Sequence, residues 1–243
     1  MAVTDHDTTA AVDEVRAAAR ERGIETISGI EITAVEHERD VHVLGYFLDP
    51  LNEPLAAFLA AQRAHRVARA EAIAARLASL GMPIDVTPLV EQAQREPGRS
   101  IGRPQVARAM VAAGHVQDIR EAFDKWLARG GPAFVARTGA SAEAVIDVIH
   151  HAGGLASLAH PGKLHIDDRI LPLKDAGLDA IEAFHPDHDA GMTERYIALA
   201  RELDLLLTGG SDFHGDPGHG LTPGSVTLPA AEWDRLRQAH AAR

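Results

Sequence analysis

Several short apolar runs of this 243-residue chain each lead directly into a cluster of His, Asp or Glu side chains. The segments between these runs have helical periodicity, and strands that alternate with helices build a parallel sheet or a barrel. Active sites of β/α barrels lie at the carboxyl ends of the strands, so polar side chains in these positions indicate chemistry. The clusters are Asp5-His6-Asp7, Gly29-Ile30-Glu31, Val41-His42-Val43, His160-Pro161 and Asp212-Phe213-His214. Imidazole and carboxylate together form the ligand set of Zn, Mn or Fe, so the clusters predict a metal site.

The sequence divides into three stretches. Residues 1–48 contain the end of a strand at 2–3, a helix over 9–22 and strands over 26–32 and 41–48. Residues 49–140 predict an all-helical insertion of about four helices, over 55–80, 88–95, 103–113 and 118–128. Residues 141–243 return to alternation, with strands over 155–159, 178–184, 205–208 and 225–228 and helices over 141–151, 192–203 and 230–241. We therefore expect an α/β fold with a parallel sheet or barrel that a helical segment interrupts.

Composition excludes several kinds of chemistry. The chain has no cysteine, which excludes disulfides, thiolate zinc sites and cysteine nucleophiles, whereas its 14 histidines favour nitrogen and oxygen ligands. A formal net charge of −11 argues against a non-specific nucleic-acid-binding face, but not against a small basic pocket for a phosphate. Residues 4–7 are polar where a signal peptide would be apolar, and no apolar run approaches the roughly 20 residues of a membrane span. The sequence therefore predicts a cytoplasmic protein without a membrane segment.

Each cluster near the amino terminus also has a structural interpretation. Three consecutive polar side chains at residues 5–7 cannot all face an apolar core, but an Asp there could equally cap the following helix. Period-2 alternation puts Glu31 on the opposite face from Ile30 and Ile32, where an inward carboxylate needs a cation; an edge strand would instead leave Glu31 in solvent. His42 lies within a strand, and a single strand histidine is more often structural than a ligand.

The clusters in the second half are more specific. The proline after His160 favours an extended backbone, which would project this side chain from the strand end. Two glycines precede the last cluster, and its Asp-x-His spacing puts Asp212 and His214 on one side of an extended segment. We expect this pair to bind metal rather than to be structural. Glu182 and His185 follow the strand over 178–184, where His185 could contact a metal or a phosphate.

These motifs resemble those of the PHP (polymerase and histidinol phosphatase) superfamily of metal-dependent phosphoesterases. The matching segments are residues 4–8 (TDHDT), 29–32 (GIEI), 42–46 (HVLGY), 159–161 (AHP) and 210–215 (GSDFHG). The chain is similar in particular to the subgroup of the 3',5'-nucleoside bisphosphate phosphatases and a 5'-3' exoribonuclease. In that subgroup a helical insertion with a Gly-Arg-Pro segment interrupts the barrel, as Gly102-Arg103-Pro104 would here. The resemblance implies a distorted seven-stranded β/α (TIM-like) barrel, here without its first strand.

The resemblance also implies an enzyme, a metal-dependent hydrolase that acts on a phosphate ester of a nucleotide or of an RNA 5' end. Two or three divalent metal ions are expected, with Mn as first choice and Zn or Fe as alternatives. The expected metal ligands are Asp5, His6, Glu31, His42, His160, Asp212 and His214. Arg103 and His185 are expected to clamp the substrate phosphate and, with Asp5 and His6, to be catalytic. Arg137 and Lys163 are further substrate-binding candidates.

The family pattern also assigns a structural role to each of the three stretches. Residues 1–48 and 141–243 would be the two parts of the barrel, and residues 49–140 would form a lid domain that sets the size of the substrate. The expected partner is a small phosphorylated nucleotide or an RNA 5' end, with no membrane and no non-specific nucleic-acid-binding face. The metal, the substrate and the oligomeric state are not fixed by the sequence.

Two departures from the family pattern leave alternatives open. Family members begin with a His-x-His strand, whereas this chain starts at the later Thr-Asp-His-Asp motif, and Gln105 stands where the subgroup has His. We expect a misassigned start codon. A genuine truncation would leave an exposed sheet edge and a degenerate module that binds metal weakly and catalyses nothing. A third interpretation, a metal-dependent amidohydrolase, usually needs a bridging lysine on a strand, and Lys125, Lys163 and Lys174 all lie outside clear strands.

Overall fold

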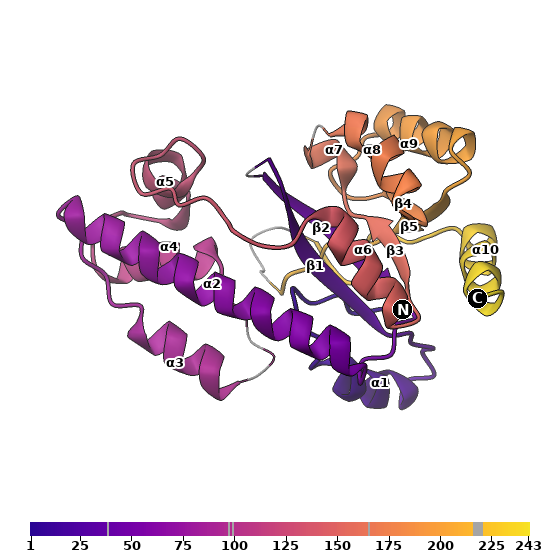
Figure 1. Ribbon diagram of the computed structural model, residues 1–243, viewed down its shortest axis with the longest axis horizontal. Helices are drawn as coiled ribbons and strands as arrows, with labels where there is room; N and C mark the ends of the chain where they lie inside the picture. The colour runs from indigo at the N-terminus through magenta and orange to yellow at the C-terminus, as the bar shows by residue number, and fades with distance from the viewer. Residues whose placement is uncertain (38, 97, 99, 165, 216–220) are drawn as a thin grey trace.

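Within the part of the chain that the structure describes, the central sheet has five strands and is open (Figure 1). The computed structural model describes residues 1–37, 39–96, 98, 100–164, 166–215 and 221–243. The strands are β1 (Gly29–Glu36), β2 (Arg39–Tyr46), β3 (Leu155–Leu158), β4 (Ala180–Phe184) and β5 (Leu206–Gly209), in that spatial order. β1, β2 and β3 pair antiparallel, whereas β3, β4 and β5 pair parallel. The α/β class is therefore confirmed, but the seven-stranded barrel is not.

The segment before β1 lies beside that strand without forming a regular strand itself. A single parallel bridge joins His6 to Glu31, flanked by hydrogen bonds from the Glu31 amide to the Asp5 carbonyl (3.1 Å) and from the Asp7 amide to the Glu31 carbonyl (2.8 Å). Gly29 permits this approach, because a Cβ atom there would lie 2.9 Å from the Val3 carbonyl oxygen. The pairing puts the first polar cluster directly beside Glu31.

One predicted strand is wrong. Residues 225–228 form no strand, and the backbone enters this segment through a turn in which the Ser225 amide donates to the Thr222 carbonyl. The apolar character of the segment serves packing instead, since Leu228 packs against the main core without a hydrogen-bonded ladder. β-propensity reflects packing against neighbouring strands, so alternate apolar side chains alone do not make a strand.

Helices cover the sheet and connect its strands. They are α1 (Val12–Arg20), α6 (Ala142–His151), α7 (Pro161–Leu164), α8 (Asp167–Asp175), α9 (Ala190–Glu202) and α10 (Ala230–Ala241). α6 packs on β1, β2 and β3, while α9 packs on β4 and β5. Ser141 and Asp189 begin α6 and α9 as N-caps, since their side chains accept the backbone amides of Ala144 and Met192. Among the described residues, no helix is long and apolar enough to cross a membrane.

The two faces of β1 and β2 differ in character. Ile30, Ile32, Val41 and Val43 face the main hydrophobic core, which α6 closes with residues such as Ile146. The opposite face carries the polar side chains of the same strands and is also buried: Glu31 is 5% exposed and Thr33 is fully buried. The alternative of an edge strand with Glu31 in solvent is therefore wrong.

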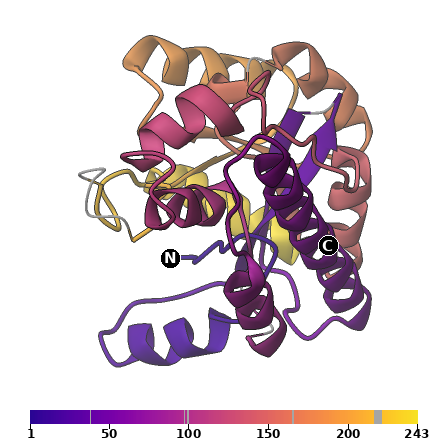
Figure 2. The same ribbon diagram turned by 90° about the vertical axis from the view of Figure 1, so that its left-hand side faces the viewer.

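The insertion between β2 and β3 is helical, as the sequence predicts. It contains α2 (Glu53–Ser79), α3 (Thr87–Arg95), α4 (Arg103–Ala112), α5 (Ile119–Ala122) and a π-helical turn over Phe123–Leu127. The insertion has a hydrophobic core of its own, to which α2 contributes Ile73 and Leu77 and α4 contributes Val106 and Met110. α2 also reaches the main core through Leu55. Figure 2, which faces the insertion, shows α2 and the shorter helices in front of the sheet.

Candidate metal centre

Three predicted ligands from adjacent chain segments meet in one group. One ligand atom each of His6, Glu31 and His42 lies within 4.8 Å of the others. The two carboxylate oxygens of Glu31 divide between the histidines, with Oε1 at 2.5 Å from His42 Nδ1 and Oε2 at 3.6 Å from His6 Nδ1. This geometry follows from the strand pairing, which brings the amino-terminal segment, β1 and β2 side by side.

His160 joins the same group from the end of β3. Its Nε2 atom lies 3.5 Å from Glu31 Oε1 and 3.2 Å from His42 Nδ1. The extended backbone expected before the proline is wrong, because His160 has a φ of +28°. Its amide donates to the buried Glu182 carboxylate at 2.8 Å, which holds this strained conformation and directs the imidazole toward Glu31.

A second group lies next to the first, at the ends of β4 and β5. His185 Nε2 is 3.4 Å from Asp212 Oδ2, and Lys163 Nζ is 3.2 Å from the same oxygen. Lys163 also pairs with Asp187 at 2.6 Å. The imidazole of His185 lies 5.5 Å from that of His160 between ring centroids, so the two groups adjoin.

The remaining two predicted ligands lie at the edge of this arrangement. His214 is exposed, and its ring lies 5.6 Å from that of His6. Asp5 is also exposed, and burial of part of its side chain raises its pKa while His214 lowers it. Asp5 is not a member of the group formed by His6, Glu31 and His42.

The charge states of Glu31, His6 and Asp212 suit metal binding. Burial raises the pKa of Glu31, but the neighbouring His42, His160 and His6 outweigh this effect and hold its pKa well below the ordinary value. Burial lowers the pKa of His6 to about 4, so its imidazole is neutral near pH 7. Burial also raises the pKa of Asp212, yet the hydrogen bond from His185 and the charges of His214 and Lys163 bring it down to about 2. Ionised carboxylates and neutral imidazoles are the ligand forms that divalent metals require.

Some ligand atoms in this arrangement make no hydrogen bond although they are buried. Among the described residues, they include His6 Nδ1 and His160 Nδ1. A buried polar atom without a partner costs about 1–3 kcal/mol, so a concentration of them in one place calls for an additional partner. Nitrogen and carboxylate donors in this arrangement fit a divalent cation of the Mn, Fe or Zn type.

Asp7 and Arg66 form a buried ion pair that the sequence analysis missed. Asp7 is fully buried at a φ of +55°, and its carboxylate accepts Arg66 Nε at 2.5 Å and the Thr33 amide at 3.0 Å. Arg66 also donates to Thr33 Oγ1 at 2.8 Å. Asp7 therefore does not cap α1, and it fixes the backbone next to His6 instead. The available signal was the run of Arg63, Arg66 and Arg69, whose spacing puts all three on one face of α2.

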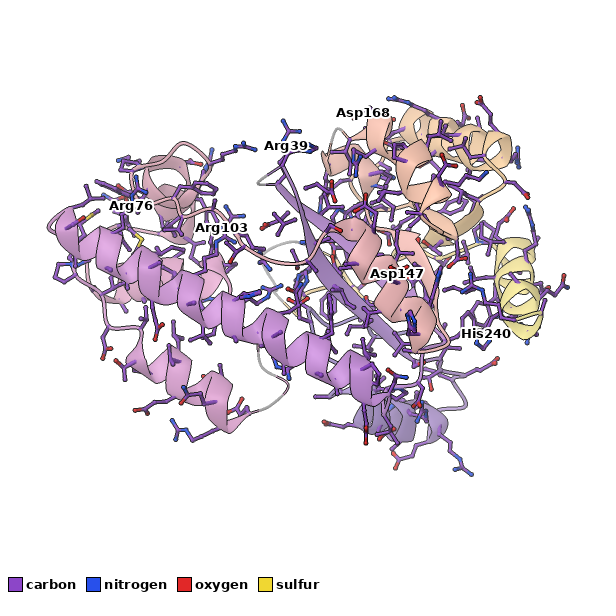
Figure 3. All side chains as sticks on the ribbon, viewed as in Figure 1. Arg39, Arg76, Arg103, Asp147, Asp168 and His240 are labelled. Atoms are coloured by element: carbon purple, nitrogen blue, oxygen red, sulfur yellow. The ribbon has the colours of Figure 1, made fainter. Side chains whose placement is uncertain are left out.

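A pocket of arginines lies beside the ligand group. Arg66, Arg69, Arg103 and Arg137 line it, together with apolar residues of α2 and α4. Asp40 Oδ1 lies 3.2 Å from Arg137 Nε, and Asp40 Oδ2 lies 3.7 Å from Arg69 and 3.6 Å from Arg103. Burial lowers the pKa of Arg137 to about 10, and the neighbouring Arg66 contributes. Figure 3 shows Arg103 toward the sheet side of the insertion and Arg76 toward the far end of α2.

Comparison with known proteins assigns the chain to a family. No protein-family model matches it. The chain is 35% identical to the 5'-3' exoribonuclease Rnm of Escherichia coli over 222 residues, which cover 88% of the chain and 74% of the relative. It is 34% identical to the 3',5'-nucleoside bisphosphate phosphatase of Chromobacterium violaceum, over 90% of the chain and 78% of the relative. The chain belongs to the PHP family of metal-dependent phosphoesterases.

Solved structures agree with this assignment. The PHP chain superimposes on a Bifidobacterium adolescentis protein described as a metal-dependent phosphoesterase with a TM-score of 0.83 and 32% identity, over 97% of this chain and 84% of that one. An amidohydrolase from Chromobacterium violaceum, solved with bound sulfate and no metal, matches with a TM-score of 0.82 and 33% identity, over 98% and 85% of the two chains.

The comparisons also decide between the functions considered. This PHP protein is a hydrolase of phosphoric ester bonds, and the alternative of a degenerate module without catalysis is not supported. The bridging lysine that amidohydrolase chemistry usually needs has no counterpart on a strand. Lys125 lies in the π-helical turn, Lys163 in α7 and Lys174 in α8, and these are the only lysines of the chain.

Proposed function

We propose that this PHP protein hydrolyses a phosphate ester, either of a nucleotide that carries a second phosphate or at an RNA 5' end. The proposed metal ligands are His6, Glu31, His42, His160, Asp212 and His214, with Asp5 as a candidate at the exposed edge. The observation that carries the proposal is the set of buried ligand atoms that make no hydrogen bond, including His6 Nδ1 and His160 Nδ1, around the Glu31 carboxylate. Two or three divalent ions, with Mn as first choice, would satisfy these atoms.

Bound metal would polarise the phosphate oxygens and lower the pKa of a water molecule to generate a nucleophile near neutral pH. Glu31, ionised between His6 and His42, holds the negative charge that keeps the ions in place. The ring nitrogen Nε2 of His185 lies 3.4 Å from Asp212 Oδ2, and His185 is the proposed hydrogen-bond donor to a phosphate oxygen bound beside this pair. Lys163 sits at the mouth of this group, half exposed, where its ammonium can bind the same phosphate.

The arginine pocket is the proposed binding site for a second anionic group of the substrate. Asp40, which contacts Arg103 and Arg137, lies two residues before His42 on the same face of β2. Two residues of a strand span about 6–7 Å, so the pocket and the metal ligands are close enough to engage two phosphates on one ribose. The names of the relatives, a nucleoside bisphosphate phosphatase and exoribonucleases, agree with such a substrate.

The helical insertion would cover this site. Its residues 49–140 provide all four pocket arginines, whereas residues 1–48 and 141–243 provide the proposed metal ligands. A substrate that reaches both sets of residues lies between the sheet and the insertion. The insertion would therefore set how large a substrate can bind.

The test compares His42→Ala with His65→Ala, an exposed histidine on α2. Each purified protein is loaded with Mn²⁺ and its metal content is measured. Phosphate release is followed from adenosine 3',5'-bisphosphate, and nucleotide release is followed from a 5'-phosphorylated RNA. We expect His42→Ala to lose metal and at least 100-fold in turnover, on the scale of a lost metal-site group, while His65→Ala behaves like the parent. Unchanged metal content and turnover in His42→Ala would refute the assignment of this group.

A further inference from the structure

Asp40 contacts three of the four arginines that line the pocket, yet these contacts are loose. The three ion pairs to Arg69, Arg103 and Arg137 measure 3.7, 3.6 and 3.2 Å. A well-formed charge-assisted hydrogen bond between such groups measures about 2.7–2.9 Å. The carboxylate is therefore held by the combined charge of three guanidinium groups rather than by a close bidentate contact.

The arginines have anchors that do not depend on Asp40. Arg69 Nε donates to the Val135 carbonyl at 2.9 Å. The Arg103 guanidinium lies 5.8 Å from the ring centroid of Phe123, and its NH1 reaches the Leu127 carbonyl at 3.5 Å. These contacts hold both side chains at the pocket independently of Asp40.

Charge in the pocket is unbalanced. Arg66 is neutralised by Asp7, which leaves Arg69, Arg103 and Arg137 against the single carboxylate of Asp40. All three guanidinium groups lie within 3.7 Å of the Asp40 carboxylate, so an incoming anion must compete with this carboxylate for them.

We propose that Asp40 is a built-in competitor that restricts the arginine pocket to dianionic groups such as a phosphate monoester. A monoanion carries the same charge as the Asp40 carboxylate and so gains no stronger attraction to the arginines. Asp40 is attached to the protein beside the pocket, and its high effective concentration favours it over a free monoanion. A dianion interacts with each arginine with twice the charge and can displace Asp40. An internal phosphodiester, which carries one negative charge, is excluded on the same ground. The inference rests on the proposed role of this pocket in binding a substrate phosphate.

The test measures anion binding directly, in metal-free protein, so that it does not depend on catalysis. Sulfate serves as the dianion and acetate as the monoanion, and both are titrated by calorimetry. We expect the parent to bind sulfate but not acetate. Asp40→Asn should bind sulfate about tenfold more tightly and acetate measurably, because the competitor has lost its charge. The matched control is Asp147→Asn, which makes the same change in net charge at an exposed position on α6, labelled in Figure 3, and should match the parent.

Two more variants separate the possible failures. Arg103→Ala should lose most sulfate binding; if it binds like the parent, the pocket is not an anion site, and both the inference and the pocket assignment fall. If Arg103→Ala loses binding while Asp40→Asn binds sulfate equally or more weakly than the parent, only the inference about Asp40 is refuted. If Asp40→Asn does not fold, sulfate binding by Asp40→Glu tests the inference instead. Its longer side chain reaches the arginines more closely and should weaken sulfate binding at least threefold, and unchanged or tighter binding would overturn the proposal.

Discussion

The buried pair of Asp7 and Arg66 gives a prediction whose size can be worked out from the structure. Asp7 is fully buried and Arg66 is 8% exposed, so neither charge is screened by water. The Asp7 carboxylate accepts hydrogen bonds from Arg66 Nε and from the Thr33 amide. Arg66→Met removes the cation and leaves the carboxylate with the Thr33 amide alone of these two donors. Removing one partner of a buried ion pair costs about 3–5 kcal/mol. Because domains are typically stable by about 5–15 kcal/mol, this loss is a large share of the total.

The assay is urea unfolding of metal-free protein. The free energy of unfolding is compared for the parent, Arg66→Met, Asp7→Asn and the double variant. Circular dichroism is followed together with tryptophan fluorescence, since Trp126 packs on the core of the insertion and Trp233 lies on α10. Coincident transitions justify the two-state treatment.

The expected result is non-additivity. The double variant should recover at least 1 kcal/mol relative to the sum of the single variants, because it leaves no buried charge without its partner. Arg201→Met, at an exposed position on α9, controls for the loss of an arginine and should change stability by less than about 0.5 kcal/mol. A cost below about 1 kcal/mol for Arg66→Met, or additive single effects, would refute the reasoning.

Three further predictions concern the site. Asp212→Ala or His214→Ala should abolish metal-dependent phosphate release with little change in circular dichroism; parent rates at unchanged metal content would contradict their role. Arg103→Ala should keep its metal, but its kcat/KM should fall by a factor that corresponds to about 1.5–3 kcal/mol, because a contact to the substrate phosphate is lost. Unchanged kinetics would mean that Arg103 serves only to begin α4. Burial raises the pKa of Glu182 to about 8, so the folded state keeps a proton that the unfolded state loses above about pH 4.5, and metal-free protein should lose stability as pH rises from 4.5 to 8. Glu182→Gln should remove that loss, and its Tm advantage should grow over this range; a constant difference in Tm would contradict the assigned pKa.

Local signals in the sequence account for much of the fold. The insertion helices and α6, α9 and α10 begin and end near the predicted residues, because capping side chains such as Asn52 and Ser141 act within a few residues of their own position. The polar residues after apolar runs meet for a similarly simple reason. Neighbouring strands bring Glu31 and His42 together, and the end of β3 adds His160.

What the sequence did not reveal depends on contacts between distant segments. The pairing of Arg66 with Asp7 joins positions 59 residues apart and follows from the path of α2 across the sheet. The role of Asp40 depends on three arginines from separate parts of the insertion. The positive φ of His160 depends on a carboxylate from β4, which overrides the usual preference before proline.

The continuity of α2 has a consequence for how the length of this chain can vary. Its 27 residues extend for about 40 Å, with Leu55 and Leu59 in the main core and Ile73 and Leu77 in the core of the insertion. One added residue between these pairs would turn everything beyond it by about 100° and advance it by about 1.5 Å. Ile73 and Leu77 would then leave the core of the insertion if Leu55 and Leu59 kept their places in the main core. Surface loops usually tolerate insertions. The middle of α2 should not tolerate the insertion or deletion of one residue, because the helix fixes the position of one core relative to the other.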